Sequence, residues 1–103
     1  MAPPLRSNAV ADPTGRTVVL DAVGWRHIRE NHPEMAAHRA AVLATVRRPD
    51  HRRPDPRPGR ERYYRRAVGP SRWCLVVVDF TQQPARVVTA FATRRDPEGW
   101  GRP

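Results

Sequence analysis

Residues 73–80 read WCLVVVDF, and positions 73–78 form an unbroken apolar run rich in β-branched residues. Such a run favours a central strand that is buried on both faces of a sheet. Two segments beside it also have strand character. Residues 62–68 alternate around Tyr64 and end at a Gly-Pro-Ser turn, and residues 86–93 (RVVTAFAT) follow the turn signal Gln-Gln-Pro. Because the connections are short, we expect these three strands to be antiparallel neighbours.

The segment before these strands has a helical pattern. Asp21 is a good N-cap, and the apolar stripe that follows it indicates a first helix. Asn31-His32-Pro33 interrupts the pattern, and proline suits the first turn of a second helix, which we expect to end at Pro49. The predicted stripes are Leu20, Val23, His27 and Ile28 for the first helix, and Met35, Val42, Leu43 and Val46 for the second.

These elements predict an α+β domain in which two N-terminal helices pack on one face of a three- to four-stranded antiparallel sheet. We expect a single domain over 16–95, a flexible Pro-rich lead-in over 1–15 and a flexible tail over 96–103. Residues 49–60 (PDHRRPDPRPGR) contain four prolines, so we expect an extended, irregular connection there. The uncovered sheet face is expected to carry Tyr64, Thr89 and arginines.

The composition indicates an anionic partner. The 103 residues carry a formal net charge of +9, and every basic residue besides histidine is arginine. A GC-rich genome would explain the choice of arginine over lysine, but not the net charge. Nucleic acid, an anionic membrane surface and an acidic protein are the candidate partners. The sequence has no apolar run near the ~20 residues that span a bilayer and no secretory signal pattern, and its one cysteine, Cys74, fits a reducing compartment. We therefore expect a cytoplasmic protein without membrane contact.

Histidine is the favoured proton-transfer residue, because arginine stays protonated and cannot act as a base. His27 on the helical stripe is either a core residue or a catalytic one. His32 lies where two helices meet, so it either replaces an N-cap or uses the anion-binding helix start for chemistry. His38 and His51 are predicted to be surface residues. The spacing of the histidines and the isolated Cys74 predict no metal site, and we expect no cofactor.

Residues 60–66 (RERYYRR) interleave cations with aromatic rings. This pattern is typical of single-stranded nucleic-acid binding, where arginine contacts phosphate and tyrosine stacks on bases; the alternative is a solvated edge strand. Arg53, Arg62 and Arg66 are the candidate substrate-binding residues. Thr89 is the polar residue within the apolar stretch 87–92, and it either bonds locally or projects into the site.

The order of these motifs resembles the barnase–EndoU–colicin–RelE-like nucleases, a family of small phage- and toxin-associated enzymes. The resemblance covers about residues 20–93, and only the loop 49–60, which contains Arg53, departs from the family pattern. It implies a metal-independent endoribonuclease in which an RNA 2′-hydroxyl attacks the adjacent phosphate, and an acidic antitoxin or immunity protein as a partner. The matching motifs are His27-Ile28, His32-Pro33-Glu34, Pro49-Asp50, Tyr64-Arg65, the strand 75–78 and the segment 88–91.

By position, the resemblance assigns catalysis to His27, His32, Tyr64 and Thr89. An enzyme requires these side chains to converge on one pocket, whereas a non-catalytic RNA- or DNA-binding module would leave them scattered. A third hypothesis is an interaction protein whose acidic partner is another protein.

Overall fold

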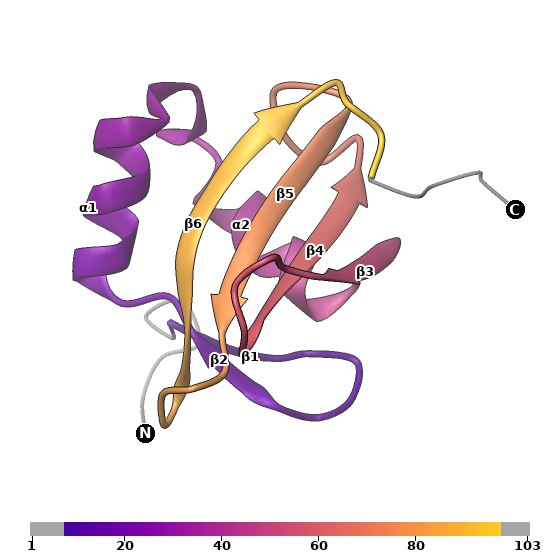
Figure 1. The fold of residues 1–103 in the computed structure, drawn as a ribbon. Coiled ribbons are helices and arrows are strands. Elements are labelled where there is room, and N and C mark those ends of the chain that lie inside the picture. The colour runs from indigo at the N-terminus through magenta and orange to yellow at the C-terminus, as the bar shows by residue number, and fades with distance from the viewer. Residues whose placement is uncertain (1–7, 98–103) are drawn as a thin grey trace, which may run out of the picture.

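The computed structural model describes residues 8–97, so the predictions for 1–7 and 98–103 lie outside the described residues. Within this range the chain folds into two α-helices, a 3₁₀ turn and one large sheet (Figure 1). In chain order the elements are β1 (Ala9–Ala11), β2 (Thr17–Val19), α1 (Ala22–Asn31), the 3₁₀ turn η2 (Pro33–Met35), α2 (Arg39–Arg47), β3 (His51–Pro54), β4 (Arg60–Arg66), β5 (Trp73–Asp79) and β6 (Ala85–Thr93).

The sheet has six strands in the order β1-β2-β6-β5-β4-β3. Its centre is the expected antiparallel meander of β4, β5 and β6, and β5 is buried along its whole length. The predicted three- to four-stranded antiparallel sheet is nevertheless wrong. Three further strands extend the meander on both sides, and β2 pairs with β6 in parallel, which makes the sheet mixed. The α+β class is retained, but the architecture is a larger, curled sheet.

Two of the additional strands, β1 and β3, lie in segments that the sequence analysis placed outside regular structure. Residues 9–11, part of the predicted lead-in, form β1 and pair with β2. Residues 51–54, part of the predicted irregular connection, form β3 and pair with β4. β3 is an edge strand, where a proline such as Pro54 is tolerated. Strands this short have too few residues to display a periodic pattern.

The two helices also differ from their predicted form. The cap at Asp21 is confirmed, because its carboxylate accepts a hydrogen bond from the backbone N–H of Gly24 at 2.7 Å. The predicted stripe is confirmed at Leu20 and Ile28, which are fully buried, and wrong at Val23, which is 67% exposed, and at His27, which is exposed. The second helix does not begin at Pro33: a 3₁₀ turn comes first, and α2 starts at Arg39.

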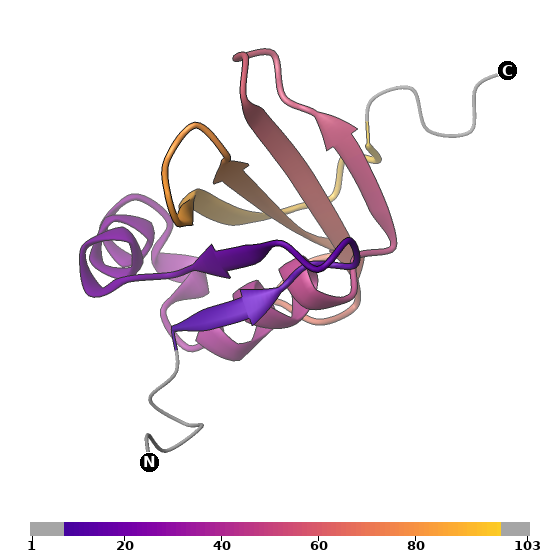
Figure 2. The ribbon, with the colours of Figure 1, turned by 90° about the horizontal axis from the view of Figure 1, so that it is seen from below.

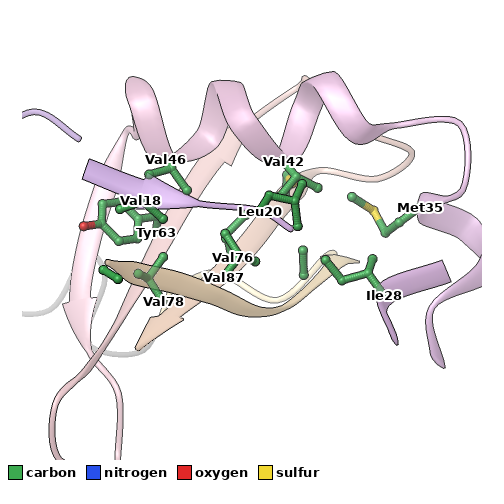
Figure 3. Packing of buried hydrophobic residues seen from close by; sticks show 13 residues of the cluster. Val18, Leu20, Ile28, Met35, Val42, Val46, Tyr63, Val76, Val78 and Val87 are labelled. Carbon is green, nitrogen blue, oxygen red and sulfur yellow. The ribbon is translucent and has the colours of Figure 1, made fainter. Parts of the chain in front are cut away.

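The main core lies between α2 and one face of the sheet. Figure 3 shows Val42 and Val46 of α2 pointing toward the strands, where Val76 and Val78 of β5 meet them. Ile28 and Met35 fill the end of this core nearest α1. Since α2 covers only this face, alternate residues of β4, β5 and β6 point to the other side.

A polar cluster links the β1–β2 loop to strand β4. The buried Asp12, in the β1–β2 loop, accepts hydrogen bonds from Tyr63 Oη at 2.7 Å and from Arg16 Nη2 at 2.8 Å. Arg16 also donates to Glu61 of β4 at 2.8 Å. Burial opposes ionisation of Asp12, but bonds from Tyr63, Thr14 and Arg16 outweigh it and hold the pKa of Asp12 well below its usual range. We call Asp12, Thr14, Arg16, Glu61 and Tyr63 the Asp12 cluster; it fastens the β1–β2 loop to β4 (Figure 2).

Candidate nucleic-acid interface

The side of the sheet away from α2 carries an ordered array of aromatic and cationic side chains, which we call the aromatic face. Strand register sets the array, because directly opposed residues on neighbouring strands share a face. The pairings place its members in three rows across the sheet. These are Phe91, Leu75, Tyr64 and His51; then Thr89, Val77, Arg62 and Arg53; and then Thr93, Trp73 and Arg66.

Trp73 packs against several side chains of this face, although it is only 1% exposed. The rings of Tyr64 and His51 approach it edge-on, with centroids 6.3 and 5.6 Å away. The guanidinium of Arg66 lies 5.6 Å from the centre of the Trp73 ring. Trp73 Nε1 donates a hydrogen bond to Asp96 Oδ1 at 3.0 Å. Packing against one rigid indole therefore fixes aromatic and charged groups from two strands, β3 and β4, and from the segment after β6.

The arginines of the aromatic face lie along β3 and β4. Arg62 Nε donates to Asp55 Oδ1 at 2.8 Å, and Arg53 lies directly opposite Arg62 in the strand register. The bond to Asp55 raises the pKa of Arg62 although burial opposes this, and a bond to Tyr64 adds to the rise. Asp55 thus holds one permanently charged guanidinium beside the Tyr64 phenol, and Arg53 and Arg66 flank it.

Two imidazoles stand at opposite ends of the Tyr64 row. His32 caps the end of α1, and its ring stacks on Phe91 with centroids 5.1 Å apart and an angle of 27°. His51, on β3, lies opposite Tyr64 and is half-buried. Burial lowers the pKa of His51, and the charge of Arg53 lowers it further. A lowered pKa favours the neutral form of the imidazole, which is the form that accepts a proton.

Most of the predicted site residues come together on this face. Tyr64, Thr89, Arg53, Arg62 and Arg66 belong to its rows, and His32 meets its edge through Phe91. His27 does not belong to it: the side chain is exposed on α1, and its Nδ1 lies 3.2 Å from Asn31 Nδ2 on the same helix.

Sequence reasoning missed His51, Trp73 and Phe91 as site residues. His51 was predicted to be a surface residue, but β3 brings it into register with Tyr64. The sequence places Trp73 and Phe91 in apolar strands but does not predict which face of the sheet they occupy. Alternation was the available signal, since Trp73 lies opposite the predicted site residue Arg66, and Phe91 shares its face with Thr89 two residues earlier on β6.

A pocket of about 350 Å³ opens on the aromatic face. Its apolar floor is formed by Tyr64, Leu75 and Phe91, and its polar rim by Arg62, Thr93, Arg95 and Asp96. A larger hollow of about 550 Å³ lies between β1 and α2, where Ala9, Val10, Ala40, Leu43 and Ala44 are flanked by Arg47, Arg48 and Arg65. Its floor is aliphatic, so aromatic stacking on a base is available in the first pocket and not in this hollow.

Comparison with known proteins gives no match to a family model, to a curated protein or to a solved structure. Within residues 8–97, no helix is both long and apolar enough to cross a membrane. The resemblance to the barnase–EndoU–colicin–RelE-like nucleases therefore stays a prediction from motif order, and the aromatic face provides a separate, physical basis for assigning a function.

Proposed function

We propose that the chain is a metal-independent endoribonuclease and that the aromatic face is its substrate site. The observation that carries the proposal is the Tyr64 row, in which a phenol beside a fixed arginine lies between two imidazoles. Aromatic side chains and arginines on a sheet surface suit an unpaired RNA strand, because bases stack on rings while phosphates contact guanidinium groups.

The arginines supply the electrostatic part of the reaction. Arg53 and Arg62 come from adjacent strands and Arg66 lies farther along β4, so a strand of RNA crossing the face meets a guanidinium at successive phosphates. One of these, Arg62, is held by Asp55 beside Tyr64. Fixed donors aimed at a phosphate stabilise the extra negative charge of a pentacoordinate phosphorane without rearranging during the reaction.

The chemistry is an internal transesterification. A neutral imidazole removes the proton of the 2′-hydroxyl, and the 2′-oxygen forms a bond to the adjacent phosphorus. The bond from phosphorus to the 5′-oxygen breaks, and a second, protonated group gives its proton to that oxygen. The products are a 2′,3′-cyclic phosphate and a 5′-hydroxyl, so no water and no metal-bound nucleophile are consumed.

His51 and His32 are the best placed pair for these two proton transfers. Three strand spacings separate β3 from β6, about 14 Å between backbones, so the two side chains serve one phosphate only by reaching toward Tyr64 from both ends of the row; Phe91 orients His32 and Trp73 orients His51. His51, whose pKa is lowered, is suited to be the base, and His32 the acid. His27, the acid or base that the resemblance implies, lies on α1 outside the aromatic face, and Tyr64 and Thr89 position the ribose phosphate.

Incubation of the purified chain with single-stranded RNA in excess EDTA tests the proposal. We expect fragments that end in a 2′,3′-cyclic phosphate, and a rate that falls about 10²- to 10⁴-fold in His51→Ala and in His32→Ala. His38→Ala, an imidazole at the start of α2, is the matched control and should cleave like the parent. Intact RNA, or equal rates in all three variants, would refute the proposed chemistry; His27→Ala in parallel decides its role.

The runner-up function is a non-catalytic RNA- or DNA-binding module that uses the same face. The observation that favours it is the number of arginines on β3 and β4 that need no imidazole in order to bind phosphate. It predicts binding whose logarithmic affinity falls linearly with the logarithm of salt concentration, with no product. Binding without fragments in the assay above would select this function.

An acidic protein partner and a cytoplasmic location also remain proposals. The hollow between β1 and α2 is a candidate surface for such a partner, because three arginines border an aliphatic floor. The buried, unpaired Cys74 is compatible with a reducing compartment.

A further inference from the structure

The pocket of about 350 Å³ has a feature that phosphate binding does not require: a carboxylate, Asp96, stands on its rim. Among arginines that attract a polyanion, a carboxylate repels phosphate. A ligand group that donates hydrogen bonds would complement this carboxylate, whereas phosphate would not. The pocket volume lies at the lower end of small-molecule sites and suits one nucleotide unit rather than a longer segment.

Two contacts hold the Asp96 carboxylate in place. Trp73 Nε1 donates to its Oδ1 at 3.0 Å, and Arg72 Nη1 lies 3.6 Å from the same oxygen. An ionised carboxylate accepts about four hydrogen bonds, so these contacts orient the group and leave acceptor capacity directed to a ligand. Half of the Asp96 side chain is solvent-exposed, which keeps the group reachable.

The floor of the pocket is apolar. Tyr64, Leu75 and Phe91 come from one row of the sheet, and His32 stacks on Phe91 at its border. A planar base laid on such a floor presents its Watson–Crick edge to the rim, where unpaired bases are read by hydrogen bonds. Arg62 and Arg95 stand on the same rim, where the phosphates on either side of the base would lie.

We infer that this pocket binds a single unpaired nucleobase and that Asp96 selects guanine. Guanine presents two adjacent N–H donors on its Watson–Crick edge, N1–H and the 2-amino group, which match the two oxygens of one carboxylate. Adenine and cytosine place a ring nitrogen acceptor beside their amino group, and uracil places carbonyl oxygens beside its one N–H. Each of these bases would turn an acceptor toward Asp96, which leaves polar groups unpaired. The inference rests on the proposed function and names the base at which the RNA is held.

Binding of the four nucleoside 3′-monophosphates, measured by calorimetry at one salt concentration, tests this directly without turnover. We expect guanosine 3′-monophosphate to bind at least about tenfold more tightly than the others, as a two-bond base contact requires. Asp96→Asn keeps the size of the side chain and an oxygen for Trp73 but replaces one acceptor with a donor. In that variant the preference should fall to about twofold or less.

Glu30→Gln, which removes an exposed negative charge from α1, is the matched control and should keep the preference of the parent. Thermal unfolding of Asp96→Asn checks that the variant is folded. Equal affinity for the four nucleotides, or a guanine preference that survives in Asp96→Asn, would overturn the inference. A guanine preference without RNA cleavage would support the pocket while rejecting the enzyme, and cleavage without base preference would do the reverse.

Discussion

Replacement of Asp12 by asparagine is expected to be among the most damaging conservative changes in this chain. Each carboxylate oxygen of Asp12 accepts three hydrogen bonds: Oδ1 from Thr14 N, Thr14 Oγ1 and Arg16 N, and Oδ2 from Arg16 Nε, Arg16 Nη2 and Tyr63 Oη. The asparagine side chain has one oxygen that accepts hydrogen bonds. Its NH₂ group replaces the other oxygen and would face three of the groups that donate to Asp12. The Asp12 side chain is fully buried, so water cannot replace the lost acceptor.

The expected loss is about 3–5 kcal/mol, because each buried donor left without an acceptor costs about 1–3 kcal/mol and Asp12 is buried although its partner Arg16 is 37% exposed. That is a large part of the 5–15 kcal/mol by which a domain is stable. Glu61→Gln is the control within the same cluster: Glu61 is one-third exposed, and the loss of its charge should cost about 1 kcal/mol or less. Urea unfolding at pH 7 measures both values. An Asp12→Asn variant within about 1 kcal/mol of the parent, or equal to Glu61→Gln, would refute the reasoning.

The pH dependence of the parent protein gives a second measurement of the same cluster. The pKa of Asp12 is lowered in the fold, so its stabilisation is fully present above the unfolded value of about 4 and is lost as pH falls below it. Burial and the bond to Asp12 raise the pKa of Tyr63, so the contribution of the phenol is present below about pH 10 and is lost at higher pH. Asp12→Asn should flatten both limbs of the curve, and unchanged limbs would contradict this assignment.

Three further predictions concern the site and the backbone. Arg53→Ala should reduce the salt slope of RNA binding by about 0.7–1, whereas Arg47→Ala on α2 should leave it unchanged. Because burial and Arg53 lower the pKa of His51, the acid limb of the pH–rate profile should lie below about pH 6.5 and disappear in His51→Asn; a limb that persists would remove His51 as the base. Gly59→Ala should destabilise the fold by about 2 kcal/mol or more, because its backbone is left-handed and a Cβ would lie 2.3 Å from Thr81 Cγ2. Gly15→Ala, left-handed but without a neighbour within 4 Å, should lose only about 1 kcal/mol in the same unfolding assay.

The centre of the fold was predictable from sequence because its pattern is local. An apolar run such as 73–78 is buried most readily as a central strand of a sheet. Short turns on both sides of it make the neighbouring strands antiparallel. The outer strands are different. β1 and β3 have three and four residues, and what stabilises them is pairing with β2 and β4, a tertiary property that a single segment does not display.

The error in α1 has a geometric cause. A helical stripe predicts which side chains share a side of the helix, but not which stripe meets the protein. α1 lies along β6, and Gly24 allows a close approach: a Cβ there would lie 3.3 Å from the carbonyl oxygen of Val87. The contact therefore runs through Gly24 and Ile28, and Val23 and His27 turn outward.

The candidate site was predictable to the extent that it follows one strand. Arg62, Tyr64 and Arg66 alternate on β4, so the sequence alone places them on one face. Their meeting with Thr89 and His51 depends on register across three strand pairs. For His51 the relevant pairing involves β3, in a segment whose prolines argue against any regular structure. The sequence alone therefore predicted the site residues of β4 but not His51 on the neighbouring strand β3.

The setting of His51 bears on the choice between an enzyme and a binding module. A protein that only binds phosphate gains from a protonated imidazole, since a positive charge adds to the attraction. Here burial and the charge of Arg53 lower the pKa of His51, against an opposing effect of Asp50, so protonation of the ring adds less to electrostatic affinity than an unshifted imidazole would. A neutral ring next to Trp73, in register with Tyr64, is instead suited to accept a proton from a bound hydroxyl. The arginine that would hold phosphate in the proposed enzyme thus also lowers the pKa of its proposed base.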